Sequence, residues 1–428
     1  MQKVLIITYY WPPAGGPGVQ RWLKFVKYLR DFNIEPVVYI PENPNYPIID
    51  DTFLNEIPEG ITIYKKPIFE PYRLASLFSK KKTKRISSGI IATKNQSFLE
   101  KTMLWVRGNF FIPDARKYWV KPSITFLKSI IEKEGIRTII TTGPPHSVHL
   151  IGLGLKKKLN LQWLVDFRDP WTSIGYHKKL KLSKASQAKH KALEYLVLTS
   201  ADKIIVTSST TKSEFEVLTK KPIRVITNGF DVDYAEEVVL DIKFTLSHIG
   251  SLLGGRNPKN LWKVISELIT EDEAFEKAIS IQFAGVVSQE VMESIEAAGL
   301  ASYANFLGYV SHEEAISIQR KSQVLLLVEI DSPETTGIIP GKLFEYLAAK
   351  RPILGIGPKE WEVVDMVTDT NSGHIYNYEA ESDLKSVILD WFLKYQQQDL
   401  SVTSIHVQQY SRRELTGKLA EYIQWESY

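Results

Sequence analysis

The chain contains no cysteine among its 428 residues. This absence excludes disulfide bonds, thiolate metal sites and cysteine nucleophiles, and it fits the reducing environment of a cytoplasm. Long apolar runs are absent too, since no stretch approaches the roughly 18 consecutive apolar residues of a membrane-spanning helix. The opening run Lys3 to Ile7 is too short for the core of a signal peptide. We therefore expect a cytoplasmic protein.

The chain also lacks a strong overall charge, because 53 Lys and Arg face 49 Asp and Glu, a net charge of +4. The distribution is nevertheless uneven. Residues 1–235 hold 37 basic and 20 acidic residues, or +17, which leaves 16 and 29, or −13, for residues 236–428. A basic first half suggests contact with an anionic surface such as membrane phospholipid, or attraction to the acidic half. Nucleic acid is not expected as a partner, since the basic residues lie in separate runs.

The chain does contain predicted strands and helices in alternation, as an α/β protein does. Short apolar runs typical of buried parallel strands alternate with segments of helical periodicity. The length suits two domains of about 200 residues each. We expect a first domain over 1–235, a second over 236–408, and a last helix over 409–428 that crosses back onto the first domain.

The most informative stretch begins after the apolar run 324–328, which predicts a buried strand. A loop with two glycines and a proline then opens a helix. Free backbone N–H groups at a helix N-terminus favour an anion such as a diphosphate, and Lys342 would add a positive charge. Glu345, one turn into the helix, is placed to accept hydrogen bonds from ribose hydroxyls. The alternative is an ordinary capped helix with a solvated Lys342. The candidate diphosphate-binding residues of the loop are Gly337, Ile338, Ile339 and Gly341.

Two further strand-to-helix loops are rich in glycine. The first contains Gly16 and follows the opening strand; it lacks the glycine spacing of a dinucleotide-binding fingerprint and is interpreted as a ligand loop or a tight turn. The second spans 250–258 and carries Arg256, a candidate phosphate ligand. His146 stands just past the predicted strand 137–142, where open α/β sheets bind ligands.

The predicted strand 161–165 is followed by Asp166, Arg168 and Asp169. Arg168 and Asp169 are candidates for binding an acceptor substrate, and the alternative is an internal ion-pair network. A basic run, 80–85, lies beside the apolar residues Ile86, Ile90, Ile91, Phe98, Leu99, Leu104 and Trp105. Such a run is either solvated or rests at a membrane interface.

These motifs together resemble the GT-B glycosyltransferases, and most closely the retaining enzymes of family 4 that are common in bacterial polysaccharide and O-antigen synthesis. The most specific part of the resemblance is Pro340 to Ala349 followed by Lys350 to Leu354. The resemblance implies two Rossmann-like domains facing a cleft. It also implies transfer of a sugar from a UDP- or GDP-sugar to a lipid-linked or polymeric saccharide.

The resemblance assigns roles to single residues. Glu345 would hold the ribose, Arg256 and Lys342 the diphosphate, and Gly16 would lie near the phosphates. His146 would reach the transferred sugar, and the main chain at Val310 would contact the base. Gly337 stands where the family has the first glutamate of a pair, which leaves the identity of the sugar open.

No metal and no cofactor are expected, since Asp231-Val232-Asp233 falls at the turn between the domains rather than beside a phosphate loop. Peripheral association with the inner face of the plasma membrane is expected. Two alternatives stay open: a nucleotide-sugar 2-epimerase of the same architecture, and a non-catalytic sugar-nucleotide-binding partner. The sequence does not indicate an oligomeric state.

Overall fold

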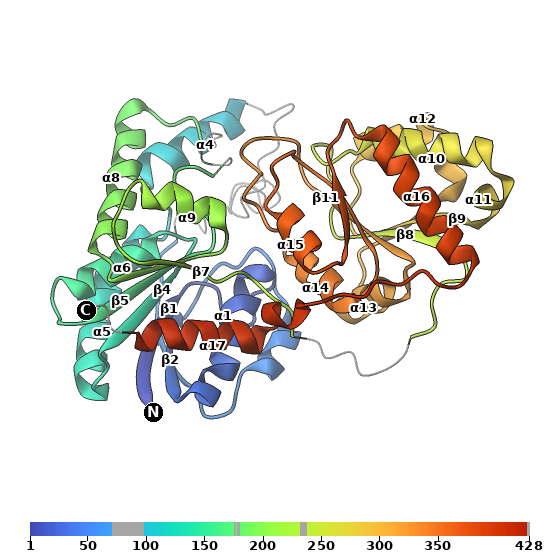
Figure 1. Ribbon diagram of the computed structural model, residues 1–428. Helices are drawn as coiled ribbons and strands as arrows, with labels where there is room; N and C mark the ends of the chain where they lie inside the picture. Colours follow the sequence, from blue (N-terminus) through green and yellow to red (C-terminus); the bar gives the residue numbers. More distant parts are fainter. Residues whose placement is uncertain (71–97, 175–176, 178–179, 232–237, 426–428) are drawn as a thin grey trace. The chain divides into compact units, whose positions relative to one another are not determined.

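The computed structural model describes residues 1–70, 98–174, 177, 180–231 and 238–425 (Figure 1). The chain forms two compact units. Unit 1 contains Met1–Asn228 and Arg412–Tyr428, and unit 2 contains Gly229–Ser411. Each unit is built on one parallel sheet.

Unit 1 has a seven-stranded sheet in the order β3-β2-β1-β4-β5-β6-β7. Its strands are β1 (Gln2–Thr8), β2 (Ile34–Pro41), β3 (Thr62–Lys66), β4 (Thr138–Gly143), β5 (Gln162–Phe167), β6 (Lys203–Val206) and β7 (Ile223–Val225). Its α-helices are α1 (Pro17–Leu29), α4 (Phe98–Phe110), α5 (Lys117–Glu134), α6 (Ser147–Lys156), α8 (Lys184–Ser200), α9 (Ser209–Glu216) and α17 (Arg412–Gln424).

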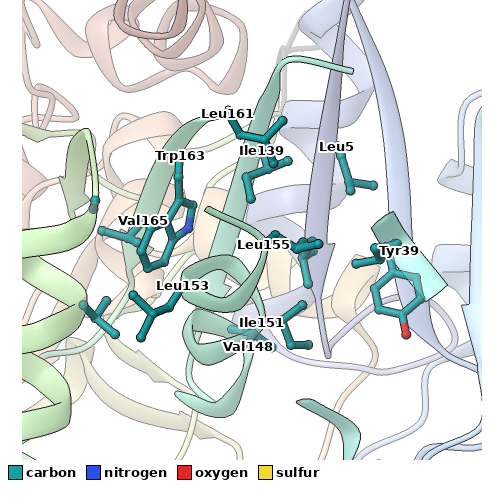
Figure 2. Close-up of a cluster of buried hydrophobic side chains, with 14 of the residues drawn as sticks. Leu5, Tyr39, Ile139, Val148, Ile151, Leu153, Leu155, Leu161, Trp163 and Val165 are labelled. Carbon is teal, nitrogen blue, oxygen red and sulfur yellow. The ribbon is translucent and has the colours of Figure 1, made fainter. Parts of the chain in front are cut away.

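The unit 1 sheet is buried on both faces because successive side chains of a strand point to opposite sides. In β1, Leu5 and Ile7 join one apolar cluster, whereas Val4 and Ile6 join another. Figure 2 shows the first cluster, in which side chains of α6 pack between Trp163 and the central strands. The second cluster is covered by α1 and α17, which pack against each other. The chain's last helix therefore completes the core of unit 1.

Unit 2 has a six-stranded sheet in the order β10-β9-β8-β11-β12-β13. Its strands are β8 (Phe244–Ile249), β9 (Ile279–Ala284), β10 (Ala304–Gly308), β11 (Val324–Val328), β12 (Ile353–Ile356) and β13 (Gly373–Tyr376). Its α-helices are α10 (Lys259–Glu271), α11 (Glu273–Ala278), α12 (Gln289–Ala297), α13 (His312–Lys321), α14 (Gly341–Ala349), α15 (Val363–Asp369) and α16 (Glu381–Gln396). Two apolar clusters again cover the two faces, one with α10 and α16 and the other with α14 and α15.

The predicted strand 324–328 coincides with β11, and α14 begins at Gly341 within the predicted stretch. The predicted end of the strand at 161–165 is wrong, because β5 continues through Asp166 and Phe167. Asp166 is fully buried in the strand, where Arg21 of α1 pairs with its carboxylate at 2.8 Å. A carboxylate buried with a charged partner can be part of a strand interior, which apolar patterning alone does not indicate.

The segment predicted to rest at a membrane interface lies only partly within the described residues. The basic run 80–85 and residues Ile86 to Ile91 lie outside the described residues, as does part of the Asp231-Val232-Asp233 turn. Assigning Leu104 to a membrane-facing set is wrong, because Leu104 is 2% exposed and packs with Leu180. Its neighbour Trp105 is 44% exposed.

Candidate functional site

The centre of the unit 2 sheet is the point where the strand order reverses. β8 and β11 are neighbours there, and the chain continues from β8 to β9 on one side and from β11 to β12 on the other. Loops that diverge from two such strands create the ligand crevice of open α/β sheets. The two loops here are 250–258 and 329–340, and both contain residues that the sequence marks as candidate ligand contacts.

Lys342 and His248 meet at this point. Nζ of Lys342, in the first turn of α14, lies 3.1 Å from Nε2 of His248 near the end of β8. The imidazole is fully buried, and its Nδ1 lies 3.0 Å from the carbonyl oxygen of Leu326 in β11. A carbonyl oxygen only accepts hydrogen bonds, so Nδ1 carries the ring proton and Nε2 accepts from Lys342. Neutral His248 thus fixes the direction of the lysine side chain.

The pKa of Lys342 lies close to neutral pH. Burial and the neighbouring Arg256 lower the pKa of Lys342 to about 7, although Glu329 and Glu345 act in the opposite direction. Burial, followed by the charge of Lys342, holds the pKa of His248 well below its usual 6.5. His248 is therefore neutral near neutral pH, whereas Lys342 gains or loses its proton there. An anion beside Lys342 would favour the charged form.

Gly250 is required at the end of β8 for two reasons. Its φ of 108° lies in a region that other residues rarely adopt. A Cβ atom added here would lie 3.0 Å from Nζ of Lys342. The glycine thus leaves the space in which the lysine amine lies.

Arg256 and Glu329 form an ion pair at the same edge, in which the carboxylate is buried and the guanidinium is partly exposed. Nε and Nη2 of Arg256 donate to Oε1 and Oε2 of Glu329 at 2.9 and 3.1 Å. Glu329 is 1% exposed, and its Oε1 also accepts from the backbone N–H of Ile330 at 2.8 Å. A bidentate pair of this kind fixes the guanidinium plane. Glu329, which is out of register with the family's glutamate pair, holds the candidate phosphate ligand Arg256 in place.

Glu345 projects from the first half of α14 toward α13. Its Oε2 accepts from Nε2 of Gln319 at 2.8 Å, and Gln319 is fully buried. One carboxylate oxygen is thus oriented by the protein, which leaves Oε1 as the second acceptor.

The loop before α14 is held by its own hydrogen bonds. The backbone N–H of Ile338 donates to Thr335 O at 3.0 Å, and the indole N–H of Trp361 donates to Ile338 O at 2.7 Å. Pro340, the N-cap of α14, makes no side-chain capping hydrogen bond, and among the described contacts the first-turn N–H of Leu343 donates to Pro340 O at 3.0 Å. Ile339 and Val310 both pack against the apolar cluster that contains Leu343.

Unit 1 has its own switch point between β1 and β4. Gly16 lies in the loop after β1, immediately before α1, with a φ of 95°. A Cβ atom added at Gly16 would meet nothing within 4 Å. The glycine therefore satisfies a backbone requirement, and its contact with a ligand stays a prediction.

His146 follows β4 and immediately precedes α6. Its ring stacks on Trp171 at 4.7 Å between centroids and 1° between planes. Both ring nitrogens are buried without a hydrogen-bond partner among the described residues, and burial holds the pKa of His146 well below 6.5. A buried imidazole with two unused nitrogens has capacity for a ligand hydroxyl. His149, in contrast, lies 2.9 Å from Thr141 Oγ1 and packs on Phe167.

Arg168 connects the loops of unit 1. Its Nε and Nη1 donate to Gly143 O and Gly18 O at 3.2 and 2.7 Å, and Nη2 donates to Pro144 O. The guanidinium therefore joins the start of α1 to the end of β4 and the loop after it, which favours the structural interpretation of this residue. Asp169 is half-buried, and burial raises its pKa while Arg168 acts to lower it.

His248 and Glu329 were not identified as site residues from the sequence. A signal for His248 existed, because a histidine at a strand end before a glycine-rich loop is the same pattern that singled out His146. Within the described ranges, no group of three or more His, Cys, Asp or Glu side chains is arranged to hold a metal ion. No described helix combines the length and apolar character needed to cross a bilayer.

Among known proteins, only solved structures match this chain; sequence comparisons find no match. No protein-family model matches the chain, and no curated protein sequence matches it. Solved structures match over nearly the whole length. WaaG, a glycosyltransferase involved in lipopolysaccharide biosynthesis, has a TM-score of 0.55 at 12% identity, with 99% of this chain and 100% of WaaG covered.

Two further structures show the range of activities among these neighbours. HepE of Anabaena, in complex with UDP and glucose, has a TM-score of 0.58 at 13% identity, with both chains covered completely. A protein assigned as a UDP-N-acetylglucosamine 2-epimerase from Listeria monocytogenes has a TM-score of 0.54 at 13% identity, with 99% of this chain and 95% of that chain covered. At such identities the likeness concerns the fold, and it confirms the predicted GT-B architecture with two Rossmann-like units.

Proposed function

We propose that the chain is a retaining, metal-independent glycosyltransferase of family 4, which moves a sugar from a nucleotide-diphosphate donor to a hydroxyl of a lipid-linked or polymeric saccharide. One observation carries the proposal: Lys342, Arg256 and the uncapped N-terminus of α14 gather at the switch point of unit 2. Lys342 and the helix N-terminus would attract a diphosphate, and Arg256, whose guanidinium Glu329 orients, would donate hydrogen bonds to it.

The same groups would act during the reaction. The bond between the anomeric carbon and the diphosphate oxygen breaks, and the acceptor oxygen forms a bond to that carbon on the same face. The acceptor's proton passes to the departing phosphate. Arg256 and Lys342 would stabilise the charge that develops on the leaving group, together with the backbone N–H groups of Gly337, Ile339 and Gly341. The N–H of Ile338 already donates to Thr335 O, so Ile338 would contribute by shaping the loop.

The remaining assignments support this reaction. Glu345 would bind the ribose through its free oxygen Oε1, and the main chain at Val310 would contact a uracil or guanine base. In unit 1, His146 would contact the transferred sugar and Gly16 the phosphates. Asp169 would bind the acceptor, with Arg168 shaping the loops beside it. A lipid-borne acceptor would make the enzyme a peripheral protein of the inner face of the plasma membrane.

A nucleotide-sugar 2-epimerase is the second candidate. The epimerase-like neighbour shares the fold at a similar TM-score, and His248 and Glu329 add an imidazole and a carboxylate to the phosphate site. An epimerase needs no acceptor and releases an epimerised sugar nucleotide, so the products of the two reactions differ.

The test incubates the purified protein with UDP-, GDP- and ADP-sugars, with and without a membrane-lipid extract, and identifies the products by mass spectrometry. Lipid-dependent release of one nucleotide, lost in Glu345→Ala and Arg256→Ala, would support transfer. Lys277→Ala, at a side chain that is 72% exposed in unit 2, is the matched control. Epimerised donor without lipid would support the second candidate, and absence of binding to every donor would contradict both.

A further inference from the structure

The loop before α14 is bonded to the residues that immediately precede α15. The indole N–H of Trp361 donates to Ile338 O at 2.7 Å, and the backbone N–H of Glu362 donates to Thr336 O at 2.9 Å. α14 and α15 lie beside each other in unit 2 (Figure 1), and Trp361 belongs to the apolar cluster that they share. Two alternate carbonyl groups of the loop therefore point toward the start of α15.

These two bonds fix the direction of two backbone N–H groups. In a trans peptide the C=O and N–H bonds point to opposite sides of the chain. The peptides that follow Thr336 and Ile338 are both trans, so the N–H groups of Gly337 and Ile339 point away from the start of α15. Neither of these N–H groups donates to an acceptor among the described residues. They are the donors that this part of the loop can offer to a ligand.

The N–H group between these two is used within the loop itself. The N–H of Ile338 donates to Thr335 O at 3.0 Å, and Thr335 is held in turn by a bond from its hydroxyl to Ile330 O at 2.6 Å. Successive N–H groups of the loop thus alternate between an outward and an inward direction. The alternation selects Gly337 and Ile339 as candidate anion ligands, which the sequence alone does not do.

Trp361 has little freedom to move. It is 1% exposed and packs in the cluster that contains Leu343 and Phe344 of α14. Its backbone N–H donates to Pro358 O at 3.1 Å. A Cβ atom added at Gly357 would collide with Cε3 of the indole, so the glycine leaves the space in which the ring lies. Because ring and backbone are both held, the indole N–H has one direction.

The indole bond matters because of what the peptide after Ile338 would do without it. A carbonyl group that loses its donor turns toward another one, and Ile338 lies in an exposed part of the loop. Rotation of that peptide plane would also turn the N–H of Ile339 away from its present direction. An N–H dipole aimed at a phosphate attracts it, whereas a carbonyl oxygen in the same place repels it.

We propose that Trp361 is a positioning residue for the diphosphate of the donor. Its indole N–H holds Ile338 O and, with the adjacent backbone N–H of Glu362, directs the N–H groups of Gly337 and Ile339 toward the phosphate oxygens. This inference rests on the proposed function, because it specifies how the loop in unit 2 recognises the donor. The chemical class that it requires is a diphosphate, and neither the sugar nor the base takes part.

The test measures binding of inorganic pyrophosphate to the full chain by titration calorimetry, with UDP, GDP, ADP and their nucleosides in parallel. Trp361→Phe keeps an aromatic ring in the cluster and removes the N–H donor. It should bind pyrophosphate and the matching nucleoside diphosphate about tenfold more weakly, which is the scale of one hydrogen bond to a charged group. It should bind the free nucleoside as wild type does. Gly357→Ala, which displaces the ring, should act in the same direction.

Two matched controls separate positioning from a general loss of stability. Trp391→Phe changes a tryptophan that is 5% exposed in the other apolar cluster of unit 2. Gly355→Ala, in β12, brings a Cβ atom against Cδ1 of Ile375 rather than against an indole. Both controls should lower stability, measured by chemical denaturation, and both should bind pyrophosphate as wild type does.

The proposal is overturned if Trp361→Phe and Gly357→Ala are folded by circular dichroism and bind pyrophosphate as wild type does. It is also overturned if they weaken the nucleoside as much as the diphosphate, if the controls weaken pyrophosphate equally, or if wild type binds no pyrophosphate. The enzymatic function is judged separately. Trp361-dependent pyrophosphate binding, in a protein that neither transfers nor epimerises any nucleotide sugar, would support the positioning role and contradict the proposed enzyme.

Discussion

Nζ of Lys342 lies 3.1 Å from Nε2 of His248, and the imidazole is anchored through Nδ1 to a carbonyl of the neighbouring strand. The lysine thus donates to a buried neutral acceptor while its own pKa is about 7. An amine in this state can take up a proton when an anion arrives. This relationship would link the proposed binding of a nucleotide-sugar donor in unit 2 to pH.

Binding of a nucleotide sugar should therefore take up a proton above neutral pH. Burial and Arg256 oppose the charge of Lys342, Glu329 and Glu345 favour it, and neutral His248 accepts a hydrogen bond from its amine. A bound diphosphate raises the pKa of Lys342, so affinity should be constant below pH 7 and fall above it, by at most about tenfold per pH unit. Calorimetry at pH 8 in buffers of different ionisation enthalpy measures the uptake. Lys342→Met should abolish it, and unchanged uptake in that variant would contradict the assignment.

Gly250→Ala should weaken donor binding beyond its effect on stability. The substitution places a Cβ atom 3.0 Å from Nζ of Lys342 and requires a φ of 108°. Gly299→Ala is the control, because Gly299 has a φ of 75° but no atom within 4 Å of its added Cβ. Both variants should lose about 1–2 kcal/mol of unfolding free energy from backbone strain, measured by chemical denaturation. Only Gly250→Ala should raise the dissociation constant of the donor, and equal effects of the two variants on that constant would argue against the placement of Lys342.

Glu345→Gln should selectively remove recognition of the ribose. A hydrogen bond to a carboxylate contributes about 2 kcal/mol, so the dissociation constant of the matching nucleoside diphosphate should rise about thirtyfold. Wild type and variant should bind the 2′,3′-dideoxy nucleotide nearly equally, because that ligand has no hydroxyl for the carboxylate to accept from. Titration calorimetry of wild type and Glu345→Gln, each with the ribose nucleotide and the dideoxy nucleotide, gives the coupling energy between Glu345 and the ribose hydroxyls. A coupling near zero would show that Glu345 serves only to hold Gln319, its 2.8 Å partner.

Unit 1 should lose stability in mild acid because of its buried histidines. Burial lowers the pKa of His149 to about 3 and that of His177 to about 4, and it holds that of His146 well below 6.5. The unfolded chain binds these protons near pH 6.5 and the folded unit does not, so stability is complete above pH 6.5 and falls below it. Each group contributes about 1.4 kcal/mol per pH unit in that range.

Denaturant titrations at pH 7 and pH 5, followed by tryptophan fluorescence, measure this loss. His149→Gln should lose less stability between the two pH values than wild type does. His312→Gln, at an exposed position of α13, should behave as wild type. An equal loss in all three proteins would contradict a role for His149.

The sequence by itself determined the elements and the edge of each sheet at which ligands are expected. Apolar runs such as 324–328 and the helical spacing of Leu343, Phe344 and Leu347 are local patterns, and the structure confirms them because burial on both faces leaves the chain little alternative. The glycine-rich loops and the candidates Arg256, Lys342 and Glu345 could also be identified from the sequence, because each lies in a local pattern of predicted strand, loop and helix start.

Only the tertiary structure decided which side chains meet. Lys342 and His248 are 94 residues apart, and Arg256 and Glu329 are 73 apart, so no sequence period connects them. The order of the strands brings the ends of β8 and β11 together and with them these pairs. Packing likewise separates the neighbours Leu104, which is buried, and Trp105, which is exposed, because a contact with Leu180 depends on the path of the whole chain.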